Sequence, residues 1–250
     1  MYPKLKNRPW KVIKSENILR LGPWLSVRQE CVEMPSGKQI PTWYVMEFPD
    51  WINVIAITKD GKMVMEDQYR HALGETHYEL VAGVVDPGET PLEAAKRELS
   101  EETGYEGGEW KLFMTLSPNP TNHNNLSYTF LARGVEKVRE QHQEPTEDIH
   151  VDVMEPAQVL EMLRDGEIIQ ALHAAPLWRY FAENKYTYLF INLPSSHFSV
   201  GYVLRRYSTD CSIVLLPEVA KGINVFPSNC GILLSIHELM ILGQMPHQIG

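Results

Sequence analysis

Five glutamates crowd one stretch of the sequence, GVVDPGETPLEAAKRELSEETGY, which covers residues 83–105. Glu98 and Glu102 are four residues apart, and Glu101 lies between them. On a helix, like charges at these spacings face one another and destabilise it by roughly 0.2–0.5 kcal/mol per pair. The stretch therefore indicates either a solvated acidic face or a group of carboxylates that a bound cation would neutralise.

A helix between Thr90 and Gly104 would position these carboxylates. Thr90 and Glu93 form a capping box, in which each side chain satisfies a backbone amide of the other residue. Gly104 is placed to end the helix. Glu98 and Glu102 then share a face that differs from the apolar one. The apolar stripe, which we expect to be buried, consists of Leu92, Ala95 and Leu99.

The loop before this helix separates the two interpretations. Gly83 and Gly88 flank an Asp-Pro turn that brings Glu89 back toward the helix. Carboxylates that converge from a loop and a helix face suit a hard cation such as Mg²⁺, which takes oxygen ligands at about 2.0–2.1 Å and recruits substrate phosphates. A solvated face explains Glu93 well, but the convergence of the others predicts a divalent cation site.

The order and spacing of the stretch are specific. They place Gly83, Glu89, Arg97, Glu98, Leu99, Glu101, Glu102 and Gly104 in one pattern. That pattern resembles the complete Nudix box. The resemblance implies an α/β (α+β) Nudix fold, with a mixed β-sheet sandwiched between helices. It also implies metal-assisted hydrolysis of a nucleoside diphosphate that is linked to another moiety.

The resemblance assigns roles to the acidic residues. Glu98 and Glu102 would be the core Mg²⁺ or Mn²⁺ ligands, with Glu101 beside them, and the Ala82 backbone carbonyl would complete the metal shell. Glu101 and Glu102 also count as catalytic candidates. Glu89 is either an outer ligand or a group that fixes the loop. Arg97 is expected to orient a helix carboxylate rather than to touch substrate.

Residues outside the box resemble the ADP-ribose pyrophosphatase-like branch of the family. They are Gln68-Tyr69-Arg70 and the run from Glu79 to Gly83, where this branch commonly has a proline in place of Val81. Arg70 is the candidate for binding a substrate phosphate, because its planar fork suits bidentate contacts. The alternative is a surface arginine at a strand end. Glu79 is either a substrate contact or an edge-strand charge.

A further acidic candidate lies in EQHQEPTEDIHV, residues 140–151. This segment is similar to the branch pattern in which an acidic residue precedes an Ile-x-Val strand. Glu147 fits that position best, and there it would be the general base for the attacking water or another metal ligand. Glu144 and Asp148 are the alternatives, and an ordinary acidic loop is the remaining interpretation.

The bulk properties exclude several classes of partner. The formal net charge of −9 argues against nucleic acid and anionic membranes, although a metal would still admit a small anionic substrate. The three cysteines form no disulfide framework and no metal-type spacing. The basic N-terminus lacks the apolar region of a secretory signal. A cytoplasmic enzyme is the plain interpretation.

The chain divides into three predicted parts. Residues 1–50 form a β-rich region, residues 51–185 the Nudix domain, and residues 186–250 a C-terminal extension with few charges and no clear period. The extension is a small β-rich element, a loosely packed segment or a non-native read-through sequence. The family resemblance also implies a homodimer whose N-terminal strands help to build the partner's site.

These observations lead to one function and two alternatives. The leading hypothesis is Mg²⁺-dependent cleavage of ADP-ribose, or of a related nucleoside diphosphate sugar, which turns ADP-ribose into AMP and ribose 5-phosphate. The first alternative is another nucleotide substrate, such as the dinucleotide NADH or a noncanonical nucleotide. The second is a module that senses ADP-ribose without cleaving it.

Overall fold

The computed structural model describes residues 5–22, 25–143 and 146–184, and the backbone of three later strands. The chain separates into two compact units, Met1–Leu177 and Trp178–Gly250. The strands of the first unit are β1 (Lys11–Leu21), β2 (Leu25–Glu33), β3 (Gln39–Glu47), β4 (Trp51–Thr58), β5 (Met63–Arg70), β6 (Glu75–Glu79), β7 (Val81–Val84), β8 (Tyr105–Leu116), β9 (Ser127–Lys137) and β10 (Ile149–Met154). The helices are α1 (Pro91–Glu98), the π-helical η1 (Leu99–Thr103), α2 (Pro156–Asp165) and α3 (Ala171–Glu183), which crosses the boundary between the units.

The first sheet contains only the N-terminal strands, in the order β1-β2-β3, and all its pairings are antiparallel. A short turn that contains Gly37 joins β2 to β3. Every residue of β1 is exposed to solvent. This strand therefore contributes nothing to the core of the described chain.

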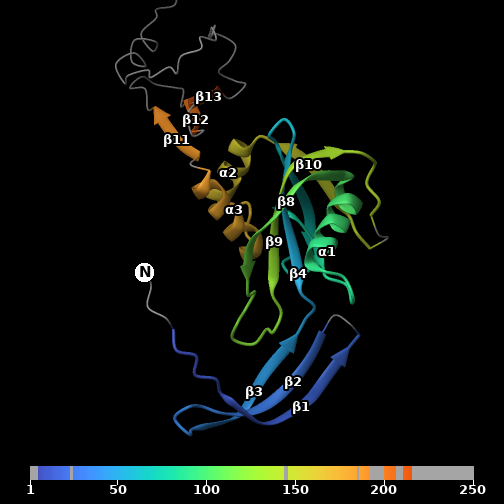
Figure 1. Ribbon diagram of the computed structural model, residues 1–250, viewed down its shortest axis with the longest axis vertical. Coiled ribbons are helices and arrows are strands. Elements are labelled where there is room, and N and C mark those ends of the chain that lie inside the picture. The colour runs from blue at the N-terminus through green and yellow to red at the C-terminus, as the bar shows by residue number, and fades with distance from the viewer. Residues whose placement is uncertain are drawn as a thin grey trace, which may run out of the picture. The chain divides into compact units, whose positions relative to one another are not determined.

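The second sheet has seven strands and positions the acidic stretch. Its order is β10-β5-β4-β9-β8, with β6 paired to β5 and β7 paired to β4. The β4–β9 pair is parallel, whereas the other pairs are antiparallel. The predicted mixed sheet is therefore confirmed. Figure 1 shows α1 and α2 on opposite sides of it.

The helix α1 packs on one face of this sheet, to which Val64 of β5 belongs. Glu66 belongs to this face, because it lies two residues after Val64 and side chains alternate along a strand. Asp67 lies on the opposite face, in line with buried Met65. The buried residues that pack together on the α1 side include Ile52, Val54, Ala56, Val64, Val81, Ala94, Ala95, Leu99, Phe130 and Ala132.

The segment HYELVAG, residues 77–83, is divided between two strands. Residues of β6 pair with β5, residues of β7 pair with β4, and Leu80 lies between them. The Leu80 amide donates to Nδ1 of His173 at 3.0 Å instead of to a neighbouring strand. The chain thus changes its pairing partner immediately before Gly83, where the acidic stretch begins.

The second unit holds a small antiparallel sheet of β11 (Tyr186–Ile191), β12 (Val200–Arg206) and β13 (Cys211–Leu215). The remainder of the predicted extension, 186–250, lies outside the described residues, so the alternatives for it stay predictions. Among the helices of the described chain, none combines the length and the hydropathy that crossing a membrane requires.

Candidate active site

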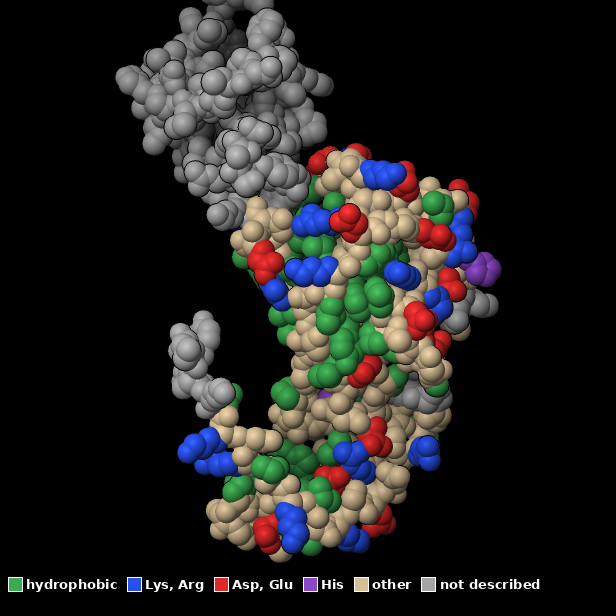
Figure 2. Space-filling view, viewed as in Figure 1, with side chains coloured by type: hydrophobic (Ala, Val, Ile, Leu, Met, Phe, Trp, Pro, Cys, Tyr) green, Lys and Arg blue, Asp and Glu red, His purple; other side chains and the backbone are tan. Residues whose placement is uncertain are grey.

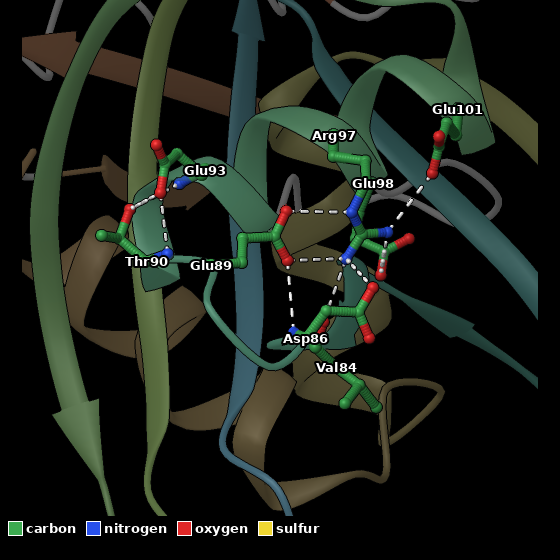
Figure 3. Close-up of polar contacts among 8 residues, drawn as sticks. All are labelled: Val84, Asp86, Glu89, Thr90, Glu93, Arg97, Glu98 and Glu101. Carbon is green, nitrogen blue, oxygen red and sulfur yellow. Dashed lines mark hydrogen bonds and ion pairs between the residues drawn. The ribbon is translucent and has the colours of Figure 1, made fainter.

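The predicted capping box begins the helix of the acidic stretch. The Thr90 amide donates to Glu93 Oε2 at 2.8 Å, and the Glu93 amide donates to Thr90 Oγ1 at 3.3 Å (Figure 3). The Thr90 hydroxyl also donates to Glu93 Oε2 at 2.7 Å. This hydrogen bond first, and then that from the Thr90 amide, lowers the pKa of the Glu93 carboxyl. Glu93 therefore serves the helix terminus, as the sequence predicts.

The same helix changes geometry where the carboxylates cluster. The α-helix ends at Glu98 and continues as a π-helical turn from Leu99 to Thr103. Gly104 ends this turn in the left-handed conformation, with φ of 74°. A Cβ atom at residue 104 would lie 2.0 Å from the Arg139 carbonyl oxygen. Gly104 is thus required both by its backbone angle and by close contact, whereas the π turn was not predicted.

The Glu98 carboxylate lies directly against the backbone of β7. A Cβ atom at Gly83 would come within 2.0 Å of Glu98 Oε1, so only glycine leaves room for this carboxylate. Glu98 is buried, and burial raises the pKa of its carboxyl to about 7 although Arg97 opposes the shift. Gly83 therefore contributes space rather than a side chain.

Glu102 is the most isolated carboxylate of the stretch. Its side chain is buried and accepts a backbone hydrogen bond from Ala82. Oε2 has no hydrogen-bond partner within the described part of the chain. Burial raises the pKa of the Glu102 carboxyl, and the negative charges of Glu66 and Glu98 raise it further. A buried acceptor without a donor is costly, so this oxygen is suited to a positively charged ligand.

Arg97 connects the loop to the helix (Figure 3). Its Nε donates to Glu89 Oε1 at 3.0 Å, and its Nη2 donates to Glu89 Oε2 and to the Val84 carbonyl oxygen, both at 3.1 Å. On the helix, Nη1 lies 2.9 Å from Glu98 Oε1 and 3.3 Å from Glu101 Oε2. The guanidinium lowers the pKa of the Glu89 carboxyl. Both Glu89 oxygens are thus bound to Arg97, which favours the loop-fixing interpretation.

The loop after β9 is attached to the π turn. The Gln141 side-chain amide donates to the Glu102 carbonyl oxygen at 2.7 Å, and the His142 amide donates to the Glu101 carbonyl oxygen at 2.8 Å. Glu147 follows this loop, and its charge raises the pKa of both Glu98 and Glu102. The structure therefore brings Glu147 near the box carboxylates.

Of the two other acidic candidates in this loop, the structure describes only Asp148. Asp148 is exposed to solvent. Glu144 lies outside the described residues, so its candidacy stays a prediction. Between the two described carboxylates, Glu147 is the one whose charge raises the pKa of the buried cluster.

Arg70 and Glu79 form an ion pair near the same face of the sheet. Arg70 Nε donates to Glu79 Oε1 at 2.8 Å, and Arg70 Nη2 contacts Glu79 Oε2. Glu79 is buried, so it is not an exposed edge-strand charge. It is instead placed to orient the arginine, and Arg70 remains partly exposed.

A histidine from α3 supports this pair, and the sequence analysis missed it. His173 is fully buried and its Nε2 lies 3.6 Å from Glu79 Oε2. Burial lowers the pKa of the His173 imidazole to about 4. Because Nδ1 accepts the Leu80 amide, the neutral ring carries its proton on Nε2, facing Glu79.

The second residue that sequence reasoning missed is Glu66 on β5. It is only 4% exposed, and its Oε1 has no hydrogen-bond partner in the described chain. Burial raises the pKa of its carboxyl, and the charges of Glu79 and Glu98 add to this effect. No local signal marks Glu66, because the residues before it in β5, Met63 to Met65, are apolar and buried on both faces.

A separate acidic group lies on the opposite face of β5. Asp67, His150 and Asp152 each offer a ligand atom, and these atoms lie within 4.8 Å of one another. His150 is 65% exposed in its side chain, and Tyr78 donates to Asp152 Oδ2 at 3.3 Å. This group contains none of the predicted cation ligands.

Comparison with known proteins identifies the family. Residues 49–174 match the NUDIX domain, and residues 10–46 match the nucleoside diphosphate sugar hydrolase N-terminal domain. The chain is similar to an ADP-ribose pyrophosphatase of Bacillus subtilis, with 32% identity over 169 residues, or 67% of this chain and 90% of that protein. It is also similar to a methanol dehydrogenase activator of Bacillus methanolicus, with 34% identity over 145 residues, or 58% and 77% of the two chains.

A solved structure supports the same fold. The crystal structure of an ADP compounds hydrolase has a TM-score of 0.63 and 19% identity, covering 73% of this chain and 97% of the other. The protein therefore belongs to the Nudix family. Within the family it falls in the ADP-ribose pyrophosphatase-like branch and is a Nudix pyrophosphatase, as the box and its flanking residues predict.

Proposed function

We propose that this enzyme hydrolyses the diphosphate of ADP-ribose or of a related nucleoside diphosphate sugar. ADP-ribose would give AMP and ribose 5-phosphate. The observation that carries the proposal is the convergence of buried Glu98 and Glu102 against β7, at Gly83 and Ala82. Similarity to ADP-ribose pyrophosphatases of Bacillus subtilis and Mycobacterium tuberculosis supports this class of substrate.

The residues at this point fit a divalent cation, Mg²⁺ or Mn²⁺. Their donor atoms are carboxylate oxygens, which hard cations prefer, and Glu102 Oε2 is buried without a partner among the described residues. Glu98, Glu101, Glu102 and the Ala82 carbonyl would hold the cation. When bound, the cation would neutralise charge on the phosphate oxygens and lower the pKa of a coordinated water.

The other residues would bind substrate and move a proton. Arg70, held by Glu79, is proposed to bind a substrate phosphate through its planar guanidinium. Glu147 is proposed to accept the proton of the attacking water, a step typically worth about 10²–10⁴-fold in rate. Arg97 would hold Glu89 and the helix carboxylates in place without touching substrate.

We propose the N-terminal sheet as the contact surface for a second copy of the chain. Figure 2 shows hydrophobic side chains gathered over this sheet in the lower part of the view. Single exposed apolar residues are ordinary, but a group of them on one element marks an interaction surface. We propose that residues 1–50 form a dimerisation region and residues 51–185 the catalytic domain. The exposed apolar residues of β1 are Val12, Ile13, Ile18, Leu19 and Leu21.

The remaining expectations about partners also stay proposals. We propose a small nucleoside diphosphate substrate and neither a nucleic acid nor a membrane as partner. A cytoplasmic location stays a prediction of the sequence. Light scattering of the wild-type protein at micromolar concentration tests the homodimer. An active monomer at that concentration would contradict it.

One assay tests the proposed function. Purified protein with Mg²⁺ is incubated with ADP-ribose, other nucleoside diphosphate sugars, NADH and noncanonical nucleotides, and a phosphatase then releases phosphate from the products. We expect release from ADP-ribose or another diphosphate sugar, and none with EDTA. Turnover of only a dinucleotide or noncanonical nucleotide would select the first alternative. Tight binding of ADP-ribose without cleavage would select the sensing module.

A further inference from the structure

Glu66 is a buried acid that the roles proposed above do not use. It lies in the middle of β5, outside the acidic stretch, and is almost inaccessible to solvent. One of its oxygens, Oε1, is buried and finds no donor in the described part of the chain. A buried carboxylate without a donor or a positive charge beside it is costly. We therefore expect a positively charged ligand to bind there.

The register of the sheet shows which way Glu66 points. It pairs with Glu79 on β6 and with Val151 on β10, and Val151 packs against the core cluster on the α1 side. Directly paired residues of neighbouring strands lie on one face of a sheet. Glu66 therefore faces the helical segment that carries Glu98 and Glu102.

The electrostatic surroundings of Glu66 agree with the placement that the strand register gives. The charges of Glu79, Glu98 and Glu147 all act on Glu66, and that of Glu66 acts on Glu102. Arg70 is the one cation that opposes them in this set, and it is already bound to Glu79. Glu66 Oε1 and Glu102 Oε2 are thus two buried oxygens without partners, one from the sheet and one from the helix.

We propose that Glu66 belongs to the divalent cation site and adds a carboxylate from β5 to those of the helix. This inference rests on the cation site of the proposed function. It differs from a purely structural role, in which Glu66 and Glu102 would share one proton and the cation would be bound equally well without Glu66.

The test is a titration of the full chain with Mn²⁺ in the absence of nucleotide. Electron paramagnetic resonance measures the free ion at each point. Glu66→Gln keeps the shape of the side chain and removes its charge. We expect its Mn²⁺ affinity to fall by about 10–100-fold, the usual effect of altering a group that supports a metal site. Asp67→Asn is the matched control, because it removes the same charge one residue away on the opposite face; its affinity should equal that of the wild type.

A second readout separates cation binding from folding. After EDTA treatment at pH 8, Glu66→Gln should melt at a higher temperature than the wild type because one buried charge is gone. Mn²⁺ should then raise its melting temperature less than that of the wild type. If Glu66→Gln does not fold, Glu66→Leu, which is apolar and of similar volume, is measured in the same way.

Two results would overturn the inference. Wild-type Mn²⁺ affinity in a folded Glu66 variant would show that the residue has only a structural role. Failure of the wild type to bind Mn²⁺ would show that the proposed cation site does not exist. Neither result depends on the substrate panel, because a protein that binds Mn²⁺ but cleaves none of the panel would contradict only the proposed function.

Discussion

Adjacent residues of β5 belong to two acidic groups with opposite surroundings. Glu66 faces the helix and lies among buried carboxylates, whereas Asp67 faces the other side and lies near His150 and Asp152. Both groups offer several ligand atoms, yet the second is partly open to water. The first leaves buried oxygens without partners in the described chain. Burial, rather than the number of acidic residues, thus distinguishes the candidate cation site.

The energetic cost of bringing carboxylates together is seen in the pKa values of the buried group. Burial raises the pKa of Glu66, Glu98 and Glu102, so each carboxyl resists ionisation. A divalent cation would reverse that preference by neutralising the ionised forms. The other group does not carry this cost to the same degree, because it is partly open to solvent and the Tyr78 hydroxyl donates to Asp152.

The largest expected effect comes from Glu102→Gln. Loss of a ligand charge removes transition-state stabilisation of several kcal/mol, which corresponds to a fall in kcat of about 10³-fold or more. Circular dichroism should show an unchanged fold, because the amide has the same shape. Asp152→Asn on the exposed face is the control and should turn over substrate normally. Wild-type activity in Glu102→Gln would refute its assignment as a ligand.

A slightly smaller and more selective effect is expected for Glu147→Gln. If Glu147 is the general base, kcat falls by about 10²–10⁴-fold, whereas Mn²⁺ affinity measured without substrate is kept. Asp148→Asn, one residue away and exposed, should leave both quantities unchanged. A parallel loss of Mn²⁺ affinity in Glu147→Gln would assign it as a metal ligand instead.

Arg97→Lys should lower the stability of the protein by loosening the contacts of the loop with the helix carboxylates. Lysine keeps the charge but cannot bind both Glu89 oxygens and the helix carboxylates with one planar fork. We expect the free energy of unfolding to fall by about 1–3 kcal/mol, the range for hydrogen bonds to charged groups. Urea denaturation measures this loss, and Lys96→Arg on the neighbouring exposed position serves as the control. An unchanged midpoint would show that Arg97 does not hold the loop.

The pH dependence of stability should differ with and without metal. In the metal-free protein the folded-state pKa of Glu66, Glu98 and Glu102 lies above the unfolded value. Their neutral forms are therefore tolerated near pH 4.5, and stability is lost as pH rises through about 7 for Glu98 and beyond for the others. Melting curves in EDTA at pH 5.5 and pH 8 measure this loss, and Mg²⁺ should reduce it. Equal stability at both pH values in EDTA would contradict the burial account.

The smallest effect is expected on the exposed side of β5. His150→Ala should change the free energy of unfolding by no more than about 0.5 kcal/mol, as surface substitutions usually do. Turnover and Mn²⁺ affinity should also stay at wild-type values. A large loss of metal affinity in this variant would indicate that the cation binds at the group on the other face of the sheet.

Local signals made the fold and the box helix predictable. The capping box and the end of the helix at Gly104 depend on contacts within a few residues, and the structure confirms them. Of the predicted apolar stripe, Ala95 and Leu99 are buried and Leu92 is partly buried. The mixed sheet was implied by the resemblance of the box to its family. These features were accessible because spacing along the chain determines them.

The missed features depend on contacts between distant segments. The π turn has no local signature, and its carbonyl groups are bound by residues of the loop after β9. The division at Leu80 involves His173, which lies 93 residues further along the chain. Glu66 joins the box carboxylates only through strand register. The sequence alone shows neither that Glu66 is buried nor which charges it meets.

The most direct test of the account is to locate the cation. Crystals soaked in Mn²⁺ and measured at the manganese absorption edge would show each bound ion by its anomalous signal. We predict a signal between Glu98, Glu102 and Glu66, and none beside Asp67, His150 and Asp152. A signal at the exposed group alone would contradict the claim that burial on the helix side of β5 defines the site.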